Sequence, residues 1–324
     1  MRRSFLMAIP LLVLFLAAGP ISVAFAKEEA VATVNGVIIP QSDLLRMMVN
    51  IQMTAQQEGR RLSQAEVVSW RKKVLDQLIG YELLYQEAKK AKLSVDPKLI
   101  DQYIAKARSG FPSDVEFKRA LSRKQLSEEI LRREIERDKL VEKYLAEKFL
   151  KTATPTEETI KKYYDAHPER WSEMRARHIL VAFDAKAPAT KAAARKKIDE
   201  ILAKLKKGAD FASMARQNSS CPSRERGGDL DFFARGQMVP EFSQAAFALA
   251  PGQLSPVVET KFGFHVIKAE EKRTISYNQA KDQIRGELLG QSMEELADRH
   301  VADLRRKARI TILLDDSGKP SAKK

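Results

Sequence analysis

The chain has 324 residues, of which 44% are hydrophobic, and it carries a formal net charge of +14 with a single cysteine. This length is enough for about two domains, each with a core of its own. One cysteine excludes an internal disulfide, so the fold must depend on packing. Basic residues alternate with acidic ones along the chain without interleaved aromatic residues, so we interpret them as solvated helix faces and expect no nucleic-acid partner.

Residues 1–26 have the pattern of a secretory signal peptide. Arg2-Arg3 gives a positive start, an apolar stretch runs from Phe5 to Ala18, and small residues allow cleavage after Ala26. The apolar run is short for a membrane span of about 20 residues and contains Pro10, which favours cleavage over an uncleaved anchor. We expect a periplasmic protein without stable membrane insertion, and a membrane-tethered form is the alternative.

The predicted elements begin with two short strands between Val31 and Ile39, joined at Asn35-Gly36, where a type I′ turn needs positive φ. From Ser42 to Lys151 the pattern is helical. Capping residues mark two helix starts, at Asp96-Pro97 and Ser113, and a long helix is expected from about Ser127 to Phe149. One apolar stripe follows spacings of three and four residues, through Val67, Trp70, Val74, Leu78, Tyr81 and Tyr85.

A further helix is expected to begin at Thr154-Pro155-Thr156-Glu157, with cap, proline and glutamate in that order, and to end at His167-Pro168. The pattern then changes to an α+β block of about 100 residues. Its predicted strands are Arg177 to Phe183, Leu230 to Phe233 and Phe264 to Ala269. Its predicted helices are Ala189 to Lys206, Asp210 to Gln217 and Pro240 to Leu249.

The C-terminal region predicts a helix from Asn278 to Lys307 and then an apolar β-type run from Arg309 to Leu314. An unpaired strand is a liability, and no partner lies nearby in the sequence. We therefore expect this run to pair with the early hairpin, so that the two ends of the chain form one discontinuous domain around the central block. Exchange of this strand between two chains would give a homodimer.

Four stretches of the central block occur in the order and at the spacing of one protein family. They are Arg177-His178-Ile179-Leu180-Val181, Gly208-Ala209-Asp210-Phe211, Gly227-Gly228-Asp229-Leu230 followed by Arg235-Gly236-Gln237-Met238, and Gly263-Phe264-His265-Val266-Ile267. Residues 175–272 thereby resemble the parvulin family of peptidyl-prolyl cis-trans isomerases. The resemblance implies a small antiparallel sheet with surrounding helices.

The resemblance also implies the site. His178 and His265 match the family's paired histidines on neighbouring strands, and Cys221 matches the position, Cys or Asp in the family, that faces them. The walls of the proline pocket are matched by Leu230, Met238 and Phe242, and Phe233 completes them. Taken singly, such residues are more often core side chains or satisfied histidines. Their occurrence together in one family pattern favours a function.

The sequence predicts neither a cofactor nor a metal site. The four histidines and one cysteine lack metal-ligand spacing, and no phosphate-binding glycine loop is present, since Gly227-Gly228 is not followed by a lysine and a helix. Prolyl isomerisation needs neither, because no covalent bond is broken.

The flanking segments look like those of the SurA/PrsA/PpiD group of extracytoplasmic chaperone-isomerases. Val34-Asn35-Gly36, the run from Leu78 to Ala88, and Ala280-Lys281 with Ile284-Arg285 carry this looser resemblance. It implies a helical domain that binds unfolded or nascent exported polypeptides containing proline. The alternative is a client-binding holdase with a weakly active or inactive parvulin module.

The expected architecture is a parvulin domain inserted in a mostly α-helical chaperone domain, and hence an α+β fold. The expected boundaries are a signal peptide at 1–26, an N-terminal helical part at 27–173, the parvulin domain at 174–273, a C-terminal helix and strand at 274–315 and a disordered tail at 316–324.

Overall fold

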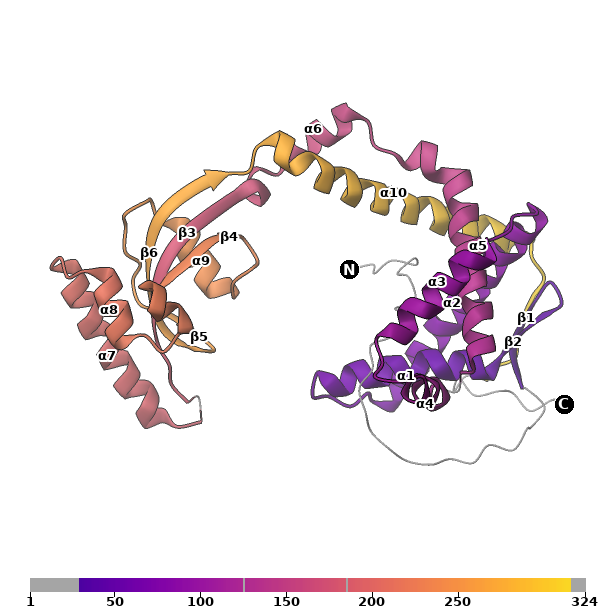
Figure 1. The fold of residues 1–324 in the computed structure, drawn as a ribbon, viewed down its shortest axis with the longest axis horizontal. Helices are drawn as coiled ribbons and strands as arrows, with labels where there is room; N and C mark the ends of the chain where they lie inside the picture. Colours follow the sequence, from indigo (N-terminus) through magenta and orange to yellow (C-terminus); the bar gives the residue numbers. More distant parts are fainter. Residues whose placement is uncertain (1–28, 125, 185, 316–324) are drawn as a thin grey trace. The chain divides into compact units, whose positions relative to one another are not determined.

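A computed structural model describes residues 29–315 except 125 and 185 (Figure 1). The expected signal peptide at 1–26 and the expected tail at 316–324 lie outside the described residues. Contacts between Cα atoms divide the chain into two units. The terminal unit consists of two chain segments, the described residues up to Thr154 and those from Leu289 onwards. The central unit is Pro155–Leu288. In the part that the structure describes, no helix is both long and apolar enough to span a bilayer.

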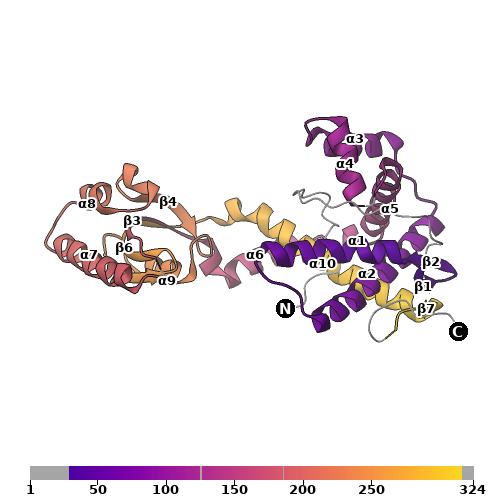
Figure 2. The ribbon, with the colours of Figure 1, turned by 90° about the horizontal axis from the view of Figure 1, so that it is seen from below.

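The terminal unit contains a three-stranded sheet in the order β2-β1-β7 (Figure 2). Strands β1 (Ala30–Val34) and β2 (Val37–Pro40) form the predicted hairpin, and its turn residues Asn35 and Gly36 have φ of 53° and 87°. Strand β7 (Ile310–Ile312) pairs antiparallel with β1, with Thr311 opposite Thr33. The predicted pairing between the two ends of the chain is confirmed.

Helices α1 (Gln41–Gln57) and α2 (Gln64–Lys90) pack on this sheet. Helices α3 (Pro97–Ser109) and α4 (Asp114–Arg123) share a separate core with α5 (Glu128–Ala153), which packs on α2. The predicted caps Asp96 and Ser113 each accept a hydrogen bond from a backbone N–H of the first turn, and Ser127 caps α5 in the same way. The apolar faces of α1 and α2 bury Leu44, Met48 and Val74 against β1 and β2.

Helix α10 (Tyr277–Lys307) contributes to the cores of both units. Its early residues Ala280 and Ile284 pack with Ile160 and Trp171 in the central unit. Its later residues, including Ala297 and Val301, pack in the terminal unit. The contact-defined central unit extends beyond the expected parvulin boundaries at 174 and 273 on both sides. It includes α6 (Glu157–Ala166), η1 (Pro168–Trp171) and the start of α10, which bury a common apolar surface.

The start of α6 differs from the prediction. The side chain of Thr156 caps the helix, accepting a hydrogen bond from the Thr159 backbone N–H at 3.2 Å, and the first helical residue is Glu157. The prediction placed the cap at Thr154 and was wrong, because Thr154 is the C-cap of α5 and is already extended.

The central unit is built on a four-stranded antiparallel sheet in the order β4-β3-β6-β5. Its strands are β3 (Ser172–Val181), β4 (Asp229–Ala234), β5 (Val258–Thr260) and β6 (Gly263–Thr274). Strands β3 and β6 extend further than predicted because cross-strand ion pairs, such as Arg273 with Glu173 at 2.6 Å, hold segments that are too polar to be recognised as strands. The sequence did not predict β5, which has three residues.

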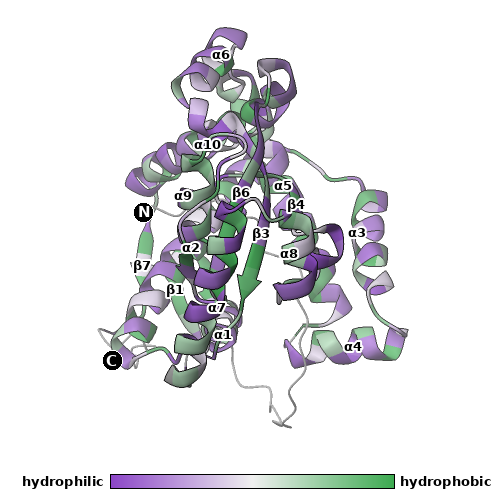
Figure 3. Ribbon diagram, turned by 90° about the vertical axis from the view of Figure 1, so that its left-hand side faces the viewer, coloured by the Kyte–Doolittle hydropathy of each residue, from purple (hydrophilic) through white to green (hydrophobic). Residues whose placement is uncertain are grey.

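Helices cover both faces of this sheet (Figure 1). Helices α7 (Pro188–Lys206) and α8 (Phe211–Asn218) pack on Ile179, Val181, Phe264 and Val266. Helix α9 (Pro240–Ala248) packs on the opposite face. Figure 3 shows β3 and β6 in hydrophobic colours only in the part of each strand that the helices cover, and in hydrophilic colours along their polar extensions.

Candidate active site

Two buried histidines lie side by side on the face of the sheet that α9 covers. His178 on β3 and His265 on β6 are 5% and 4% exposed. Their rings stack at 20° with centroids 5.4 Å apart, and their Nδ1 atoms are 3.2 Å apart. The pairing register sets Leu180 opposite His265 and His178 opposite Ile267, so the histidines are diagonal neighbours on one face.

A hydroxyl group holds the outer nitrogen of each ring. Nε2 of His178 lies 3.1 Å from Ser223 Oγ, and Nε2 of His265 lies 2.9 Å from Thr260 Oγ1. A hydrogen bond between two Nδ1 atoms needs one protonated and one bare nitrogen, so the two neutral rings must be opposite tautomers. All the hydrogen bonds of this network are therefore donated in the same direction, from one hydroxyl group through both rings to the other hydroxyl group.

Both imidazoles are uncharged at neutral pH. Burial lowers the pKa of His178 to about 4, and a positive charge on His265 would lower it as well. Burial likewise lowers the pKa of His265 to about 4. Protonation would also disrupt the Nδ1 contact, because both nitrogens would then be donors.

Two glycines bring Ser223 to the histidines. Ser223 lies on the short helix η2 (Pro222–Arg226), and Gly227 and Gly228 follow with φ of 65° and 83°. The Gly228 carbonyl accepts a hydrogen bond from the His178 backbone N–H at 2.9 Å. A Cβ at Gly228 would lie 2.4 Å from the His178 carbonyl oxygen, so only glycine permits this approach.

Apolar side chains form a cup over the histidine pair. The ring of Phe242 on α9 meets both imidazoles edge to face, with centroids 5.6 Å from His178 and 5.4 Å from His265. Leu230 and Met238 are partly buried and pack beside it. Phe233 is 2% exposed and packs against Phe242, which is itself 4% exposed, so the two rings form the buried base of the cup and the accessible surface belongs to Leu230 and Met238.

Cys221 lies in the same loop, and its expected place facing the histidines stays a prediction. It is half-buried and directly precedes η2 without a side-chain capping hydrogen bond, and its backbone N–H donates to Ser219 Oγ at 3.3 Å. Among the hydrogen bonds of the described residues, the partner of the His178 ring is the hydroxyl of Ser223 and not the Cys221 thiol.

Ser223 and Thr260 were missed by the sequence analysis. A single serine or threonine carries no pattern of its own. The available signal was their fixed distance from stretches already recognised: Ser223 is two residues after Cys221, and Thr260 is five residues before His265.

A hollow of about 460 Å³ opens beside this network. It is lined by Phe183, Lys191, Glu241, Glu259, Thr260 and Lys261, so Thr260 contacts both the hollow and His265. Lys191 and Glu259 form an ion pair at 2.6 Å across it. Within 29–315, leaving out 125 and 185, no three His, Cys, Asp or Glu side chains are grouped as metal ligands would be.

A neutral histidine pair under an apolar cup, on a four-stranded antiparallel sheet between helices, defines a parvulin-type peptidyl-prolyl cis-trans isomerase. Comparison with known families agrees. The PPIC-type PPIASE domain matches residues 159–273, and a SurA-like N-terminal domain matches residues 2–145. The fold is accordingly a parvulin domain with helical N- and C-terminal segments.

The chain belongs to the PrsA foldase family. It is 32% identical over 238 residues to Foldase protein PrsA of Caldanaerobacter subterraneus subsp. tengcongensis, which covers 73% of this chain and 69% of that protein. A putative peptidyl-prolyl cis-trans isomerase of Helicobacter pylori is 36% identical over 168 residues, covering 48% of this chain and 54% of the relative. The crystal structure of PrsA from Bacillus anthracis is 27% identical and covers 72% of this chain and 96% of that one, with a TM-score of 0.37.

The hydroxyl of Thr260 is expected to position His265. Thr260→Val keeps the side-chain shape but removes the partner of the ring nitrogen and of the Phe262 backbone N–H, which lies 3.1 Å away. We expect the free energy of unfolding to fall by about 1–3 kcal/mol, and kcat/KM for prolyl exchange to fall with it. Thr260→Ser should restore most of both. Equal stability and rate for the valine variant and the wild type would contradict this role.

Proposed function

We propose that this protein accelerates isomerisation of X-Pro bonds in unfolded exported polypeptides, working in the periplasm as an isomerase and chaperone. The observation that carries the proposal is the pair of buried, neutral histidines beneath an apolar cup. Export rests on the signal pattern of residues 1–26. Relatives named foldases support unfolded proteins as clients.

The reaction needs only rotation about the C–N bond that precedes proline. Its barrier is near 18–20 kcal/mol because resonance gives that bond partial double-bond character. In the twisted state the resonance is lost, and with it much of the polarity of the planar amide. A dry apolar cup therefore favours the twisted state over both planar forms. Each tenfold in rate requires about 1.4 kcal/mol of such differential binding.

The histidine pair serves this mechanism by position and not by proton transfer. A base with a pKa near 4 is a poor proton acceptor at neutral pH, and twisting an amide releases no proton. The two rings fix the floor of the cup through Phe242 and lock β3 to β6. Nucleophilic attack by Cys221 is a poorer hypothesis, since the chemistry needs no covalent intermediate.

Exchange kinetics on an Ala-Pro peptide test the proposal. We expect Met238→Ala to lower kcat/KM by roughly tenfold, because the cup loses apolar surface that would grip the proline ring. Cys221→Ala should keep most of the activity. The matched control is Met214→Ala, which removes the same side chain from a partly buried position on the opposite face of the sheet and should leave the rate near that of the wild type.

Absence of exchange in the wild type would favour the holdase alternative. Equal losses for Met238→Ala and Met214→Ala would mean that the rate follows stability, and the assignment of the cup would then be wrong.

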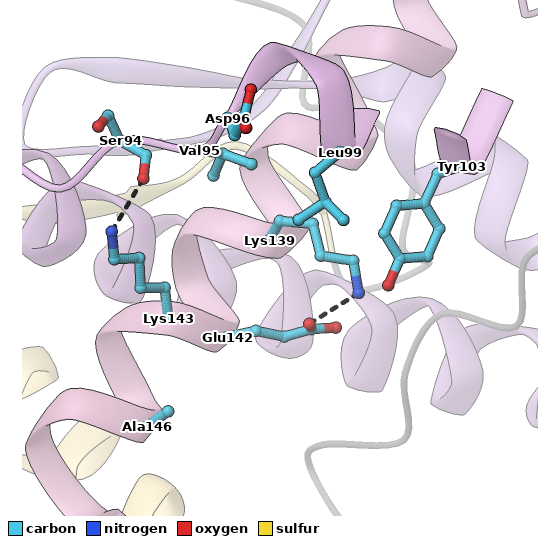
Figure 4. A pocket seen from close by; sticks show the side chains of 9 residues that line it. All are labelled: Ser94, Val95, Asp96, Leu99, Tyr103, Lys139, Glu142, Lys143 and Ala146. Atoms are coloured by element: carbon cyan, nitrogen blue, oxygen red, sulfur yellow. Dashed lines mark hydrogen bonds and ion pairs between the residues drawn. The ribbon is translucent and has the colours of Figure 1, made fainter. Parts of the chain in front are cut away.

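A second observation supports client binding by the terminal unit. A hollow of about 440 Å³ lies between α3 and α5 (Figure 4). Val95, Leu99, Tyr103 and Ala146 give it apolar surface, and Leu99 is 39% exposed. Its rim is ordered by an ion pair of 2.7 Å between Lys139 and Glu142 and by a hydrogen bond from Lys143 to the Ser94 carbonyl oxygen. We propose that apolar client segments bind here weakly and without strict sequence demands.

Suppression of client aggregation tests this hollow. Leu99→Asp should weaken suppression several-fold because it places a charge on the apolar surface, and prolyl exchange on a short peptide should not change. The control is Val115→Asp, which makes the same kind of change in the first turn of α4 at a side chain that is 65% exposed and outside the hollow. Equal suppression by both variants would overturn the assignment.

A further inference from the structure

The segment from Pro188 to Lys207 concentrates positive charge on the central unit. It contains seven basic and two acidic residues: Lys191, Arg195, Lys196, Lys197, Lys204, Lys206 and Lys207, against Asp199 and Glu200. All but the last basic residue belong to α7. In the sequence these residues look like one more alternating helix, but folding places them together on one outer surface, which we call the α7 surface.

The α7 surface is exposed and mostly unpaired. The opposite side of the helix is buried on the sheet through Ala194, Ile198, Ile201 and Leu205. Two of the seven cations form ion pairs, Lys191 with Glu259 and Arg195 with Asp199. Among the described residues, no ion pair involves the other five, which are Lys196, Lys197, Lys204, Lys206 and Lys207.

The sheet separates the α7 surface from the histidine pair. Helix α7 packs on the face that carries Ile179 and Val266, whereas the cup lies on the α9 face (Figure 1). Helix α9 carries one acidic residue and no basic residue, so charge is unequal across the two layers. A peptide lying in the cup cannot reach Lys196, Lys197 or Lys204 through the sheet, so these cations suit a partner other than the substrate.

The geometry points to an anionic phospholipid surface as that partner: we propose that α7 holds the central unit against negatively charged lipid headgroups while the cup stays open. A helix of 19 residues is about 28 Å long, and its cations lie at separate points around the exposed side. Mobile headgroups can adapt to such an array. A folded acidic partner would need a matching pattern and an apolar anchor, and the residues between the charges are small, such as Ala192, Ala193 and Ala203.

The small residues between the cations of the α7 surface determine how it would bind a membrane. No exposed aromatic or large aliphatic side chain lies among the described positions of the α7 surface, so the contact is electrostatic and peripheral, without insertion. It must weaken as salt shortens the screening length. Each basic residue near an anionic surface raises the partition coefficient roughly fivefold.

Vesicle sedimentation of the exported form of the chain tests the proposal. The probes are phosphatidylcholine vesicles with and without phosphatidylglycerol. The test variant replaces Lys196, Lys197, Lys204 and Lys206 with glutamine. The control variant makes the same change at Lys89, Lys98, Lys106 and Lys151, four exposed lysines of the terminal unit that form no ion pair with a described residue. Both variants lose the same net charge.

The wild type should bind only the vesicles that contain phosphatidylglycerol, and the α7 variant, which lacks four cations, should bind them roughly several hundredfold more weakly. The control variant should lose much less of its vesicle binding. Both variants should catalyse prolyl exchange on a free Ala-Pro peptide at the wild-type rate. Equal losses in the two variants, or undiminished binding by the α7 variant, would overturn the proposal. So would binding of soluble polyglutamate at α7 without binding of anionic vesicles, which would indicate an acidic protein partner. Failure of the isomerase function would appear separately, in the exchange assay.

Discussion

The central unit depends on keeping two imidazoles neutral inside a protein core. A buried histidine loses its charge because water is absent, and a buried neutral histidine must still satisfy both ring nitrogens. His178 and His265 meet this demand by bonding to each other, and Ser223 and Thr260 satisfy the remaining nitrogens. The hydroxyls in turn require the η2 turn and the β5–β6 hairpin to lie where they do.

This constraint links fold to function. Strands β3 and β6 must be adjacent and in register for the rings to meet, and Phe242 must cover them to keep water out. The cup above them is apolar, and in the proposed mechanism this apolar surface favours the twisted prolyl amide. Because one face of the sheet is committed to this cup, the other face is free for a different use, and α7 on that face carries the charge.

Many elements of the fold could be predicted from the sequence because helix caps and apolar runs are signals carried by neighbouring residues. Capping side chains located the helices, and an apolar run without a neighbour, from Arg309 to Leu314, correctly indicated pairing with the first hairpin. The family pattern located both histidines and the cup. What could not be predicted depends on contacts distant in sequence: the hydroxyl partners of the histidines, the polar extensions of β3 and β6 that cross-strand ion pairs stabilise, and the gathering of scattered lysines on one side of α7.

Nitrogen-15 NMR of the two imidazoles across pH tests the central claim most directly. Because burial lowers the pKa of both rings to about 4, we predict that each stays neutral, as opposite tautomers, from pH 8 down to about 5. Histidines of the unfolded chain take up protons near pH 6.5, so the contribution of these two rings to the free energy of unfolding should be constant above that pH and fall as the pH drops from about 6.5 towards 4. Either ring titrating near 6.5 in the folded protein, or both as the same tautomer, would contradict the account.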